Sequence, residues 1–361
     1  MYSRARILPW LEENVQEMRQ SRRKTLATIV LSALCLQGVG VLALGRAMAG
    51  EVSAKHCIKR VWRFLRNDQV EVEAVFQAVL CAILPAQKQV SILADWTDRG
   101  AFQQLVLAVS KDGRAIPVVC VTVPKGTTTK RQQGAMIRGE AKAIDILSRI
   151  LPEGKDVIIM ADRGFANQRW MTAIEQRGWY FVQRMKEDFM LDTDQHIGSF
   201  AELGIRRGWR PRSHGTGSVF GNEFGPIHAI SVFEHAADEA LYLITNLPTH
   251  TAKQLVNLYK KRMWIEAMFR DLKNRDWGLG ADHVKLSTAA RHTNHFLILM
   301  LAYLFLCALG TIAEANGLAK KLKANTAKER TLNLLRIGFY AKHKLRCSLK
   351  SALKQLRALP A

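Results

Sequence analysis

The chain lacks the features that mark a secreted, zinc-bound or repetitive protein. Its six cysteines are scattered, none belongs to a Cys-x-x-Cys pair, and no histidine lies near them at zinc-finger spacing. They are therefore expected to be reduced thiols in a cytosolic protein, mostly as small core residues. The opening stretch MYSRARILPWLEENVQ has no apolar signal-peptide core, so secretion is not expected. The sequence also contains no internal repeat and no low-complexity tract.

Acidic residues are scarce relative to basic ones. The 361 residues include 53 Lys and Arg but 31 Asp and Glu, which gives a formal net charge of +22. This excess is larger than solubility requires and predicts a polyanionic partner, because each cation placed on a phosphate releases a condensed counterion. Nucleic acid is the first candidate, and an anionic membrane and a ribosome-like assembly are the alternatives.

Long uncharged stretches are few. Residues 25–45 are long enough to span a bilayer, but polar and glycine residues interrupt them, which favours two short helices that meet at a Gln-Gly turn. Residues 296–313 (FLILMLAYLFLCALGTIA) are more apolar and lie at the lower length limit for a span. A helix buried on all sides in a large soluble core has the same composition, so neither stretch decides between the two classes.

Three regions of different character predict two or three domains. Residues 1–87 are basic and helical in pattern, and residues 319–361 hold twelve Lys or Arg and a single acid. Residues 88–318 begin as strands and then alternate strands with helices, which predicts an α/β (α+β) domain with a mixed sheet and helices on its faces. A glycine-rich stretch at about 186–246 is predicted to be a β-rich insertion into that domain.

The middle region is expected to alternate five strands with helices around the insertion. Three consecutive antiparallel strands begin at Gln89, and a basic loop then leads to a helix from Met136 to Leu151. The buried strand DVIIMAD, another helix and the strand WYFVQRM follow. After the insertion, a single helix that Thr249 or Thr251 caps is expected to run to about Arg275.

The two terminal regions carry candidate contacts with partners. Residues 51–68 (EVSAKHCIKRVWRFLRND) interleave cations and apolar residues at helical spacing, so that one face can pack while the other meets phosphate. The DNA-binding candidates there are Lys59, Arg60 and Arg63, and a solvated basic face is the alternative. The C-terminal region is expected to be helical, with a leucine stripe that could contact a second copy: Leu349, Leu353 and Leu356.

Three carboxylates are candidate metal ligands. Asp95 and Asp162 each close an apolar strand, where a sheet presents side chains to a ligand, and Glu266 lies on a later helix. Converging in so basic a protein, they would attract hard divalent cations, and oxygen ligands select Mg²⁺ or Mn²⁺. A single aspartate after a strand is more often a turn former or helix cap. Asp98 is the alternative ligand if the first strand ends later.

The helix around Glu266 has a charged stripe. At about 100° per residue, four side chains fall within an arc of about 60°: Tyr259, Arg262, Glu266 and Lys273. Facing a phosphodiester and a metal ion, Arg262 and Lys273 would hold phosphate oxygens and Tyr259 would donate a hydrogen bond. The alternative is a solvated helix face in which Glu266 pairs with Arg262 or Arg270.

These residues carry a resemblance to a known family. The order and spacing of Tyr259, Arg262, Glu266 and Lys273 resemble the signature of the YREK group of insertion-sequence transposases, a DDE group. The stretches LADWT and MADRGF look like its two aspartate motifs, and LGRAMAG…KHCIKRVWRFLRND is similar to its DNA-binding region. The match extends from about residue 20 to residue 300.

The resemblance implies a ribonuclease-H-like catalytic core, interrupted by the β-rich insertion, behind a helical DNA-binding domain. It implies a transposase that excises and integrates an insertion sequence by metal-dependent hydrolysis and transesterification, through a hairpin intermediate. Asp95, Asp162 and Glu266 would hold two Mg²⁺ ions, or Mn²⁺ as a substitute, about 3.5 to 4 Å apart. The apolar residues 296–313 would then be core packing.

The resemblance also implies partners and a location. The expected partners are double-stranded DNA, as terminal inverted repeats and as target, and a second copy of the chain in a synaptic homodimer, with no membrane. The expected location is the cytoplasm of a bacterium, at the nucleoid. Hairpin formation implies a flipped base stacked on a tryptophan of the insertion, for which Trp209 is the candidate. Trp209 could instead anchor the inserted strands, and Trp179 and Trp264 are expected to be structural.

Two other functions fit parts of the pattern. A ribonuclease-H-like nuclease or resolvase would need the carboxylates but not end-specific binding. A catalytically inactive DNA-binding protein descended from a transposase would not need the carboxylates, so the complete set argues against it. A basic membrane protein is the weakest alternative.

Overall fold

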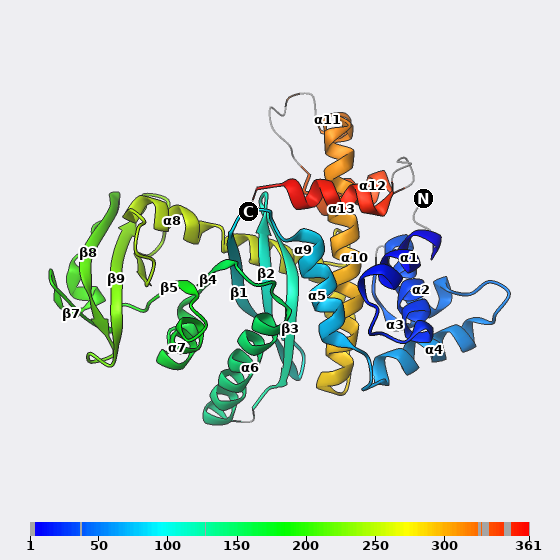
Figure 1. Cartoon of the computed structure of the whole chain (residues 1–361), viewed down its shortest axis with the longest axis horizontal. Coiled ribbons are helices and arrows are strands. Elements are labelled where there is room, and N and C mark those ends of the chain that lie inside the picture. The colour runs from blue at the N-terminus through cyan, green and yellow to red at the C-terminus, as the bar shows by residue number, and fades with distance from the viewer. Residues whose placement is uncertain are drawn as a thin grey trace.

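The computed structural model describes residues 4–36, 38–126, 128–323, 326, 332–342 and 348–360. Along its long axis, the N-terminal helices lie at one end, a sheet with flanking helices lies in the middle, and further strands form the other end (Figure 1). The helices before the sheet are α1 (Arg4–Asn14), α2 (Gln20–Leu36), α3 (Val41–Ala47), α4 (Ala54–Arg66) and α5 (Val72–Ile83). The expected pair of helices within residues 25–45 is therefore confirmed.

The central sheet begins with three antiparallel strands, as predicted. They are β1 (Gln89–Arg99), β2 (Phe102–Lys111) and β3 (Arg114–Pro124). The strands β4 (Asp156–Ala161) and β5 (Tyr180–Arg184) then lie parallel to β1 on its other side. The resulting order β3-β2-β1-β4-β5 is a mixed α/β sheet consistent with a ribonuclease-H-like core.

The helices between these strands cover the sheet. They are α6 (Thr129–Ile150) and α7 (Gln168–Glu175). The predicted start of the first helix at Met136 is wrong, because the side chain of Thr128 accepts a hydrogen bond from the backbone N–H of Arg131 and caps the helix earlier. Lys130 and Arg131, which were assigned to a loop, are therefore helical.

The inserted strands continue this sheet. They are β6 (Met190–Thr193), β7 (Ile197–Ser199), β8 (Trp209–Val219), β9 (Phe224–Phe233) and β10 (Leu241–Thr245). Strand β10 pairs with β5, and the order runs on as β10-β9-β8-β6-β7, so the described strands form one ten-stranded sheet. The division into domains at residues 87 and 318 stays a prediction.

The predicted single helix around Glu266 is two helices, α8 (Ala252–Lys260) and α9 (Met263–Lys273). Thr251 caps α8 by accepting a hydrogen bond from the N–H of Gln254. Between the helices, the N–H of Arg262 donates to Tyr259 O at 2.8 Å, which is the tighter i→i−3 pattern. No proline or glycine marks this break in the sequence.

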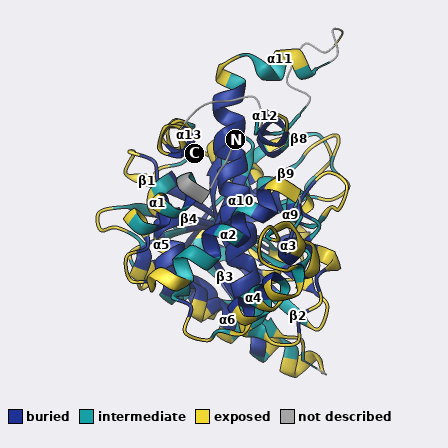
Figure 2. Ribbon diagram, turned by 90° about the vertical axis from the view of Figure 1, so that its right-hand side faces the viewer, coloured by how far each residue is buried: buried dark blue, intermediate teal, exposed yellow. Residues whose placement is uncertain are grey.

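The apolar residues 296–313 lie in α10 (Ala289–Ala315), and their burial is almost complete (Figure 2). This helix packs against β3 and against α2, α4, α5, α12 and α13. By length and composition it could cross a membrane, as could α2 and α3 taken as one bent span, but the apolar part of α10 is wholly buried inside the protein. Its composition is therefore explained by core packing, as the resemblance implied.

The C-terminal helices are α11 (Leu318–Leu322), α12 (Leu334–Ala341) and α13 (Leu349–Ala358). The leucine stripe of α13 is at most 5% exposed because it packs within the chain, so the idea that it contacts a second copy is wrong. The buried Lys111 donates hydrogen bonds to Arg357 O at 2.9 Å and to Leu359 O at 3.0 Å. These bonds fasten the C-terminal end of α13 to β2.

The cysteines are reduced where they are described. Cys35, Cys57, Cys81, Cys120 and Cys307 are free thiols, of which three are buried. Burial raises the pKa of Cys120 to about 12, so this thiol stays protonated as a small core residue. Cys347 lies outside the described residues.

Helices α10 and α12 cross so closely that a glycine of each lies against the backbone of the other. A Cβ on Gly310 would meet Leu334 O at 2.0 Å, and one on Gly338 would meet Leu306 O at 2.1 Å. We expect Gly310→Val to lower the free energy of unfolding by about 3 kcal/mol, since neither backbone can yield easily. Urea denaturation measures this change. Gly134→Ala in α6, where the nearest atom is 3.5 Å away, is the control and should be neutral or stabilising; equal losses in both variants would contradict the crossing.

Candidate active site

Two aspartates lie side by side on neighbouring parallel strands. The pairing of β1 with β4 ends at Ala94 and Ala161, so Asp95 and Asp162 are the next residues of the two strands. The prediction that Asp95 closes its strand is wrong, because β1 stays paired with β2 as far as Arg99. Asp95 instead marks the point where β4 ends and the sheet opens on one side.

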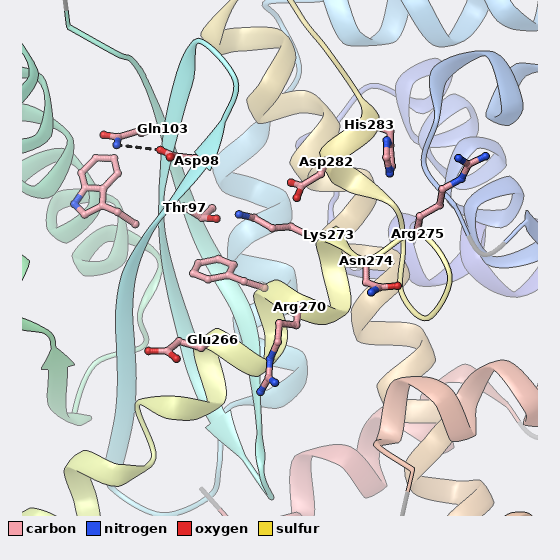
Figure 3. Close-up of a pocket in the computed structure, with 12 residues that line it drawn as sticks. Thr97, Asp98, Gln103, Glu266, Arg270, Lys273, Asn274, Arg275, Asp282 and His283 are labelled. Carbon is pink, nitrogen blue, oxygen red and sulfur yellow. Dashed lines mark hydrogen bonds between the residues drawn. The ribbon is translucent and has the colours of Figure 1, made fainter. Parts of the chain in front are cut away.

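The alternative ligand Asp98 does not join this pair. Its carboxylate accepts a hydrogen bond from Gln103 Nε2 at 3.1 Å and lies 3.0 Å from Lys125 Nζ. Figure 3 shows it beside Gln103, away from Glu266. Successive strand residues alternate between faces, so residues three apart point to opposite sides of β1.

Arg262 lies among the three candidate carboxylates. Its guanidinium nitrogens are 2.8 Å from Glu266 Oε1, 3.2 Å from Asp162 Oδ2 and 3.8 Å from Asp95 Oδ2. The arginine side chain is 9% exposed. The structure thus brings together Asp95, Asp162 and Glu266, which come from β1, the end of β4 and α9, around one cation.

The break between α8 and α9 makes this arrangement possible. Arg262 is the N-cap residue of α9, one helical turn before Glu266, and its charge lies beside carboxylates from two other elements. Glu266 does form the ion pair with Arg262 that the solvated-face alternative predicted. This pair is part of a larger cluster, because Arg262 also lies beside Asp95 and Asp162. The guanidinium faces protein carboxylates and not solvent, which the prediction of a phosphate contact did not foresee.

The cluster has an excess of negative charge. Three carboxylates surround one guanidinium, and burial raises the pKa of Asp95 to about 7, against the opposing effect of Arg262 and with a further raising effect of Asp162. A buried carboxylate with so incomplete a counter-charge is a suitable ligand for a divalent cation. The donors are all carboxylate oxygens, which fits Mg²⁺ or Mn²⁺.

The carboxylates are not yet arranged as a closed metal site. Among the described residues, no group of three or more His, Cys, Asp and Glu side chains is close enough to hold an ion by itself. Arg262 occupies the space that the carboxylate oxygens share. Asp95, Asp162 and Glu266 are therefore the residues that could hold an ion, once the guanidinium moves aside.

The other members of the charged stripe separate from one another. Tyr259 is buried at the end of α8, and burial raises its pKa to about 12, against the opposing effect of Arg262. Lys273 lies at the far end of α9 and points toward Thr97 and Asp98 (Figure 3). It lines a hollow of about 910 Å³ that also contains Glu266, Phe269 and Arg270.

Sequence reasoning missed several residues around Asp162. Gln183 Nε2 is buried and donates a hydrogen bond to Asp162 O at 2.6 Å. Arg163 follows Asp162 and Arg184 follows Gln183 in the sequence, and both form ion pairs with Glu239. The guanidinium nitrogens of Arg163 and Arg184 lie 3.1 Å and 2.5 Å from the carboxylate oxygens of Glu239. Arg163 was visible in MADRGF as the residue after the aspartate, whereas Arg184 and Glu239 are far apart in the sequence and become neighbours only through the pairing of β5 with β10.

Trp209 lies away from the carboxylate cluster. It begins β8, and β4, β5, β10 and β9 separate that strand from β1. The guanidinium of Arg212 lies over its ring, 3.8 Å from the ring centroid. Trp179 is buried and Trp264 is partly buried against the core, as expected of structural residues.

The N-terminal candidates divide into two kinds. Lys59 and Arg63 are exposed on α4, together with Lys55 and Arg66. Arg60 is partly buried, and its guanidinium donates hydrogen bonds to Thr25 Oγ1 at 3.1 and 3.3 Å. Arg60 therefore joins α4 to α2, while the other two side chains face solvent.

The chain matches the model of a known protein family. The family model described as "Transposase DDE domain" matches residues 96–305, which is more than half of the 361 residues. The matched segment contains Asp162 and Glu266 and begins one residue after Asp95. No match was found among curated proteins.

Arg262 lies where a bound metal ion would lie, so the two cations should compete for the carboxylates. Without divalent ions, Arg262→Ala should lower the free energy of unfolding by roughly 2 kcal/mol, because the largely buried Asp95 and its two half-buried neighbours lose their counter-charge. Added Mn²⁺ should then raise the melting temperature of this variant more than that of the unchanged protein, since no guanidinium competes. Differential scanning fluorimetry in EDTA and in Mn²⁺ measures both effects.

Arg270→Ala is the matched control, because Arg270 is on the same helix but is exposed and outside the cluster. It should change neither the stability in EDTA nor the response to Mn²⁺. An identical Mn²⁺ response in Arg262→Ala and the unchanged protein would show that the guanidinium and the ion do not compete.

Proposed function

The chain belongs to the family of transposase DDE domains, and on this premise we propose that it is an insertion-sequence transposase of the YREK group. It excises and integrates its element by metal-dependent phosphodiester hydrolysis and transesterification at the element's ends. The observation that carries this proposal is the convergence of Asp95, Asp162 and Glu266 on one buried cation. The complete carboxylate set also disfavours an inactive DNA-binding descendant.

The three carboxylates are proposed to hold the catalytic ions. Bound as a pair, Mg²⁺ or Mn²⁺ ions supply Lewis-acid stabilisation of the attacking and leaving oxygens of an in-line displacement at phosphorus. Burial of Asp95 supports this role, because a desolvated carboxylate binds a cation more strongly than an exposed one. Gln183 positions the turn after β4 by its hydrogen bond to Asp162 O.

The remaining stripe residues are proposed to bind the reacting phosphate. Tyr259, whose pKa burial raises to about 12, keeps its hydroxyl proton at neutral pH and can donate it to a phosphate oxygen. Lys273, in the same hollow as Glu266, supplies a positive charge to the next phosphate along the strand. Arg262 would leave the carboxylates as the ions bind, and its guanidinium would turn to the DNA backbone. The side chain would thus contact the carboxylates before ions bind and a phosphate afterwards.

The reaction sequence follows from the resemblance. Water attacks at the element's end and frees a 3′-hydroxyl, which attacks the opposite strand to form a hairpin. Reopening of the hairpin yields the 3′-hydroxyl that attacks target DNA. A base leaves the helix at the hairpin, and Trp209 is proposed to stack on it, since the ring that Arg212 now covers suits a base equally well.

The exposed face of α4 is proposed to bind the ends. Lys55, Lys59, Arg63 and Arg66 fall within an arc of about 80° at 100° per residue, while Cys57, Val61, Phe64 and Leu65 are buried. Such a helix can pack on one side and meet phosphates on the other. Two copies in a synaptic homodimer would bring two ends together.

Substitution of a carboxylate tests the catalytic proposal. The purified protein, Mg²⁺ and DNA with the inverted repeats that flank the gene should yield 3′ nicks, hairpins and strand-transfer products on a sequencing gel. Glu266→Gln should reduce all three by more than about 100-fold, since even outer-shell partners of metal ligands are worth 10- to 100-fold. Glu234→Gln removes an exposed carboxylate that pairs with Lys260 and should keep full activity. Cleavage that persists in Glu266→Gln would refute the metal-ligand assignment.

The two kinds of residue on α4 give a further test. Lys59→Ala with Arg63→Ala should weaken binding of end DNA and lower the slope of log K against log salt by about 2, one phosphate contact for each cation lost. Arg60→Ala should instead lower the melting temperature, because its hydrogen bonds to Thr25 join two helices. Fluorescence anisotropy at several salt concentrations measures the first effect. An unchanged slope in the double variant would show that the basic face of α4 is solvated and does not contact DNA phosphates.

A further inference from the structure

A second hollow, of about 340 Å³, adjoins the one that contains Glu266. Arg114, Arg270, Asn274, Trp277, Asn333 and Arg336 contribute to its lining. It shares Arg270 and Asn274 with the larger hollow. Arg270 points away from Lys273 (Figure 3) and lines both hollows. The cationic surface therefore continues from the carboxylate cluster around α9 to α12.

An exposed tryptophan forms one side of this hollow. Trp277 is 55% exposed, and the guanidinium of Arg336 lies over its ring, 4.4 Å from the centroid. The turn that carries it is fixed, because Asn274 Oδ1 accepts hydrogen bonds from the N–H groups of Asp276 and Trp277, both at 2.8 Å. A large aromatic ring held outward beside an arginine is a surface on which a nucleic-acid base can stack.

The charges of the hollow favour an anion. Its one acid, Asp271, is turned inward: it accepts hydrogen bonds from Tyr303 Oη at 3.2 Å and Asn333 Nδ2 at 2.8 Å, and lies 3.3 Å from Arg114 Nε. Arg270 and Arg336 have no such carboxylate partner among the ion pairs of the described residues. Arg270 is exposed, and Arg336 is half-buried over the ring of Trp277. Neither guanidinium is neutralised by a carboxylate of the described residues, and guanidinium groups bind phosphate oxygens in a bidentate way.

We propose that this Arg270, Trp277 and Arg336 hollow binds the backbone and one base of the target DNA during strand transfer. The inference rests on the proposed function, since only a transposase brings a second DNA to the carboxylates. Contacts with phosphates and with the face of one stacked base do not depend on the base sequence. A site of this kind therefore fits a target DNA of no fixed sequence better than it fits the element's ends. Because the hollow continues the groove that holds Glu266, a strand bound there passes directly to the reacting centre.

Two reactions measured separately test this inference. Trp277→Ala and Arg336→Ala should each cleave end DNA at the unchanged rate. With pre-cleaved ends and a duplex target that lacks the inverted repeats, each variant should lose roughly 10-fold or more of target binding and strand transfer, which is the effect of one lost stacking contact. Trp277→Phe, which keeps an aromatic ring, should recover most of the loss.

Arg169→Ala is the matched control, because Arg169 is exposed on α7 and lines neither hollow. It should keep both reactions, and the melting temperature of each variant checks its folding. Normal strand transfer by Trp277→Ala together with normal end cleavage would overturn the inference and leave the proposed function intact. Absence of end cleavage in the unchanged protein would instead refute the proposed function. Loss of end cleavage in the Trp277 or Arg336 variants would assign the hollow to the element's ends, and would also overturn the inference.

Discussion

The contact of one buried guanidinium with three carboxylates is the interaction on which the rest of the site depends. Arg262 can reach Asp162 and Asp95 only because α8 and α9 are separate helices, and the two aspartates adjoin only because β1 and β4 pair in parallel up to Ala94 and Ala161. Burial makes the charges of Arg262 and Asp95 costly without their partners. The cluster therefore links the sheet and the helix in one arrangement, with a local excess of negative charge in a chain of net charge +22.

This distribution of charge separates two tasks. The basic surfaces, such as the exposed face of α4 and the two hollows that share Arg270, are proposed to attract a polyanion and to hold its phosphates. The acidic cluster is half-buried at the edge of the larger hollow, and we propose that it attracts cations at the point where a phosphate would react. A protein cation in the cluster keeps the carboxylates from repelling one another before DNA and ions arrive. We propose that ion binding then exchanges one cation for others and releases the guanidinium of Arg262 beside the reacting phosphate.

The sequence supported the architecture well, because long apolar stretches that end in Asp95 and Asp162 and a regular spacing around Glu266 are strong local signals. The mixed sheet and its three antiparallel strands followed from such signals, whereas the burial of α10 followed only from the family resemblance, because its apolar composition also fits a membrane span. The break before Arg262 did not, since no proline or glycine marks it and contacts with other elements decide it. The extension of β1 to Arg99 depends on pairing with β2, and the meeting of Trp277 with Arg336 depends on how α12 packs against α10. Neither can be obtained from a local pattern.

The most direct measurement is a crystal structure of the protein with Mn²⁺ and end DNA, with anomalous scattering used to locate the ions. We expect anomalous peaks at about 2.0 to 2.2 Å from carboxylate oxygens of Asp95, Asp162 and Glu266, with the guanidinium of Arg262 turned to a DNA phosphate. Manganese bound elsewhere, with Arg262 still among all three carboxylates, would contradict both the ligand assignment and the exchange of cations.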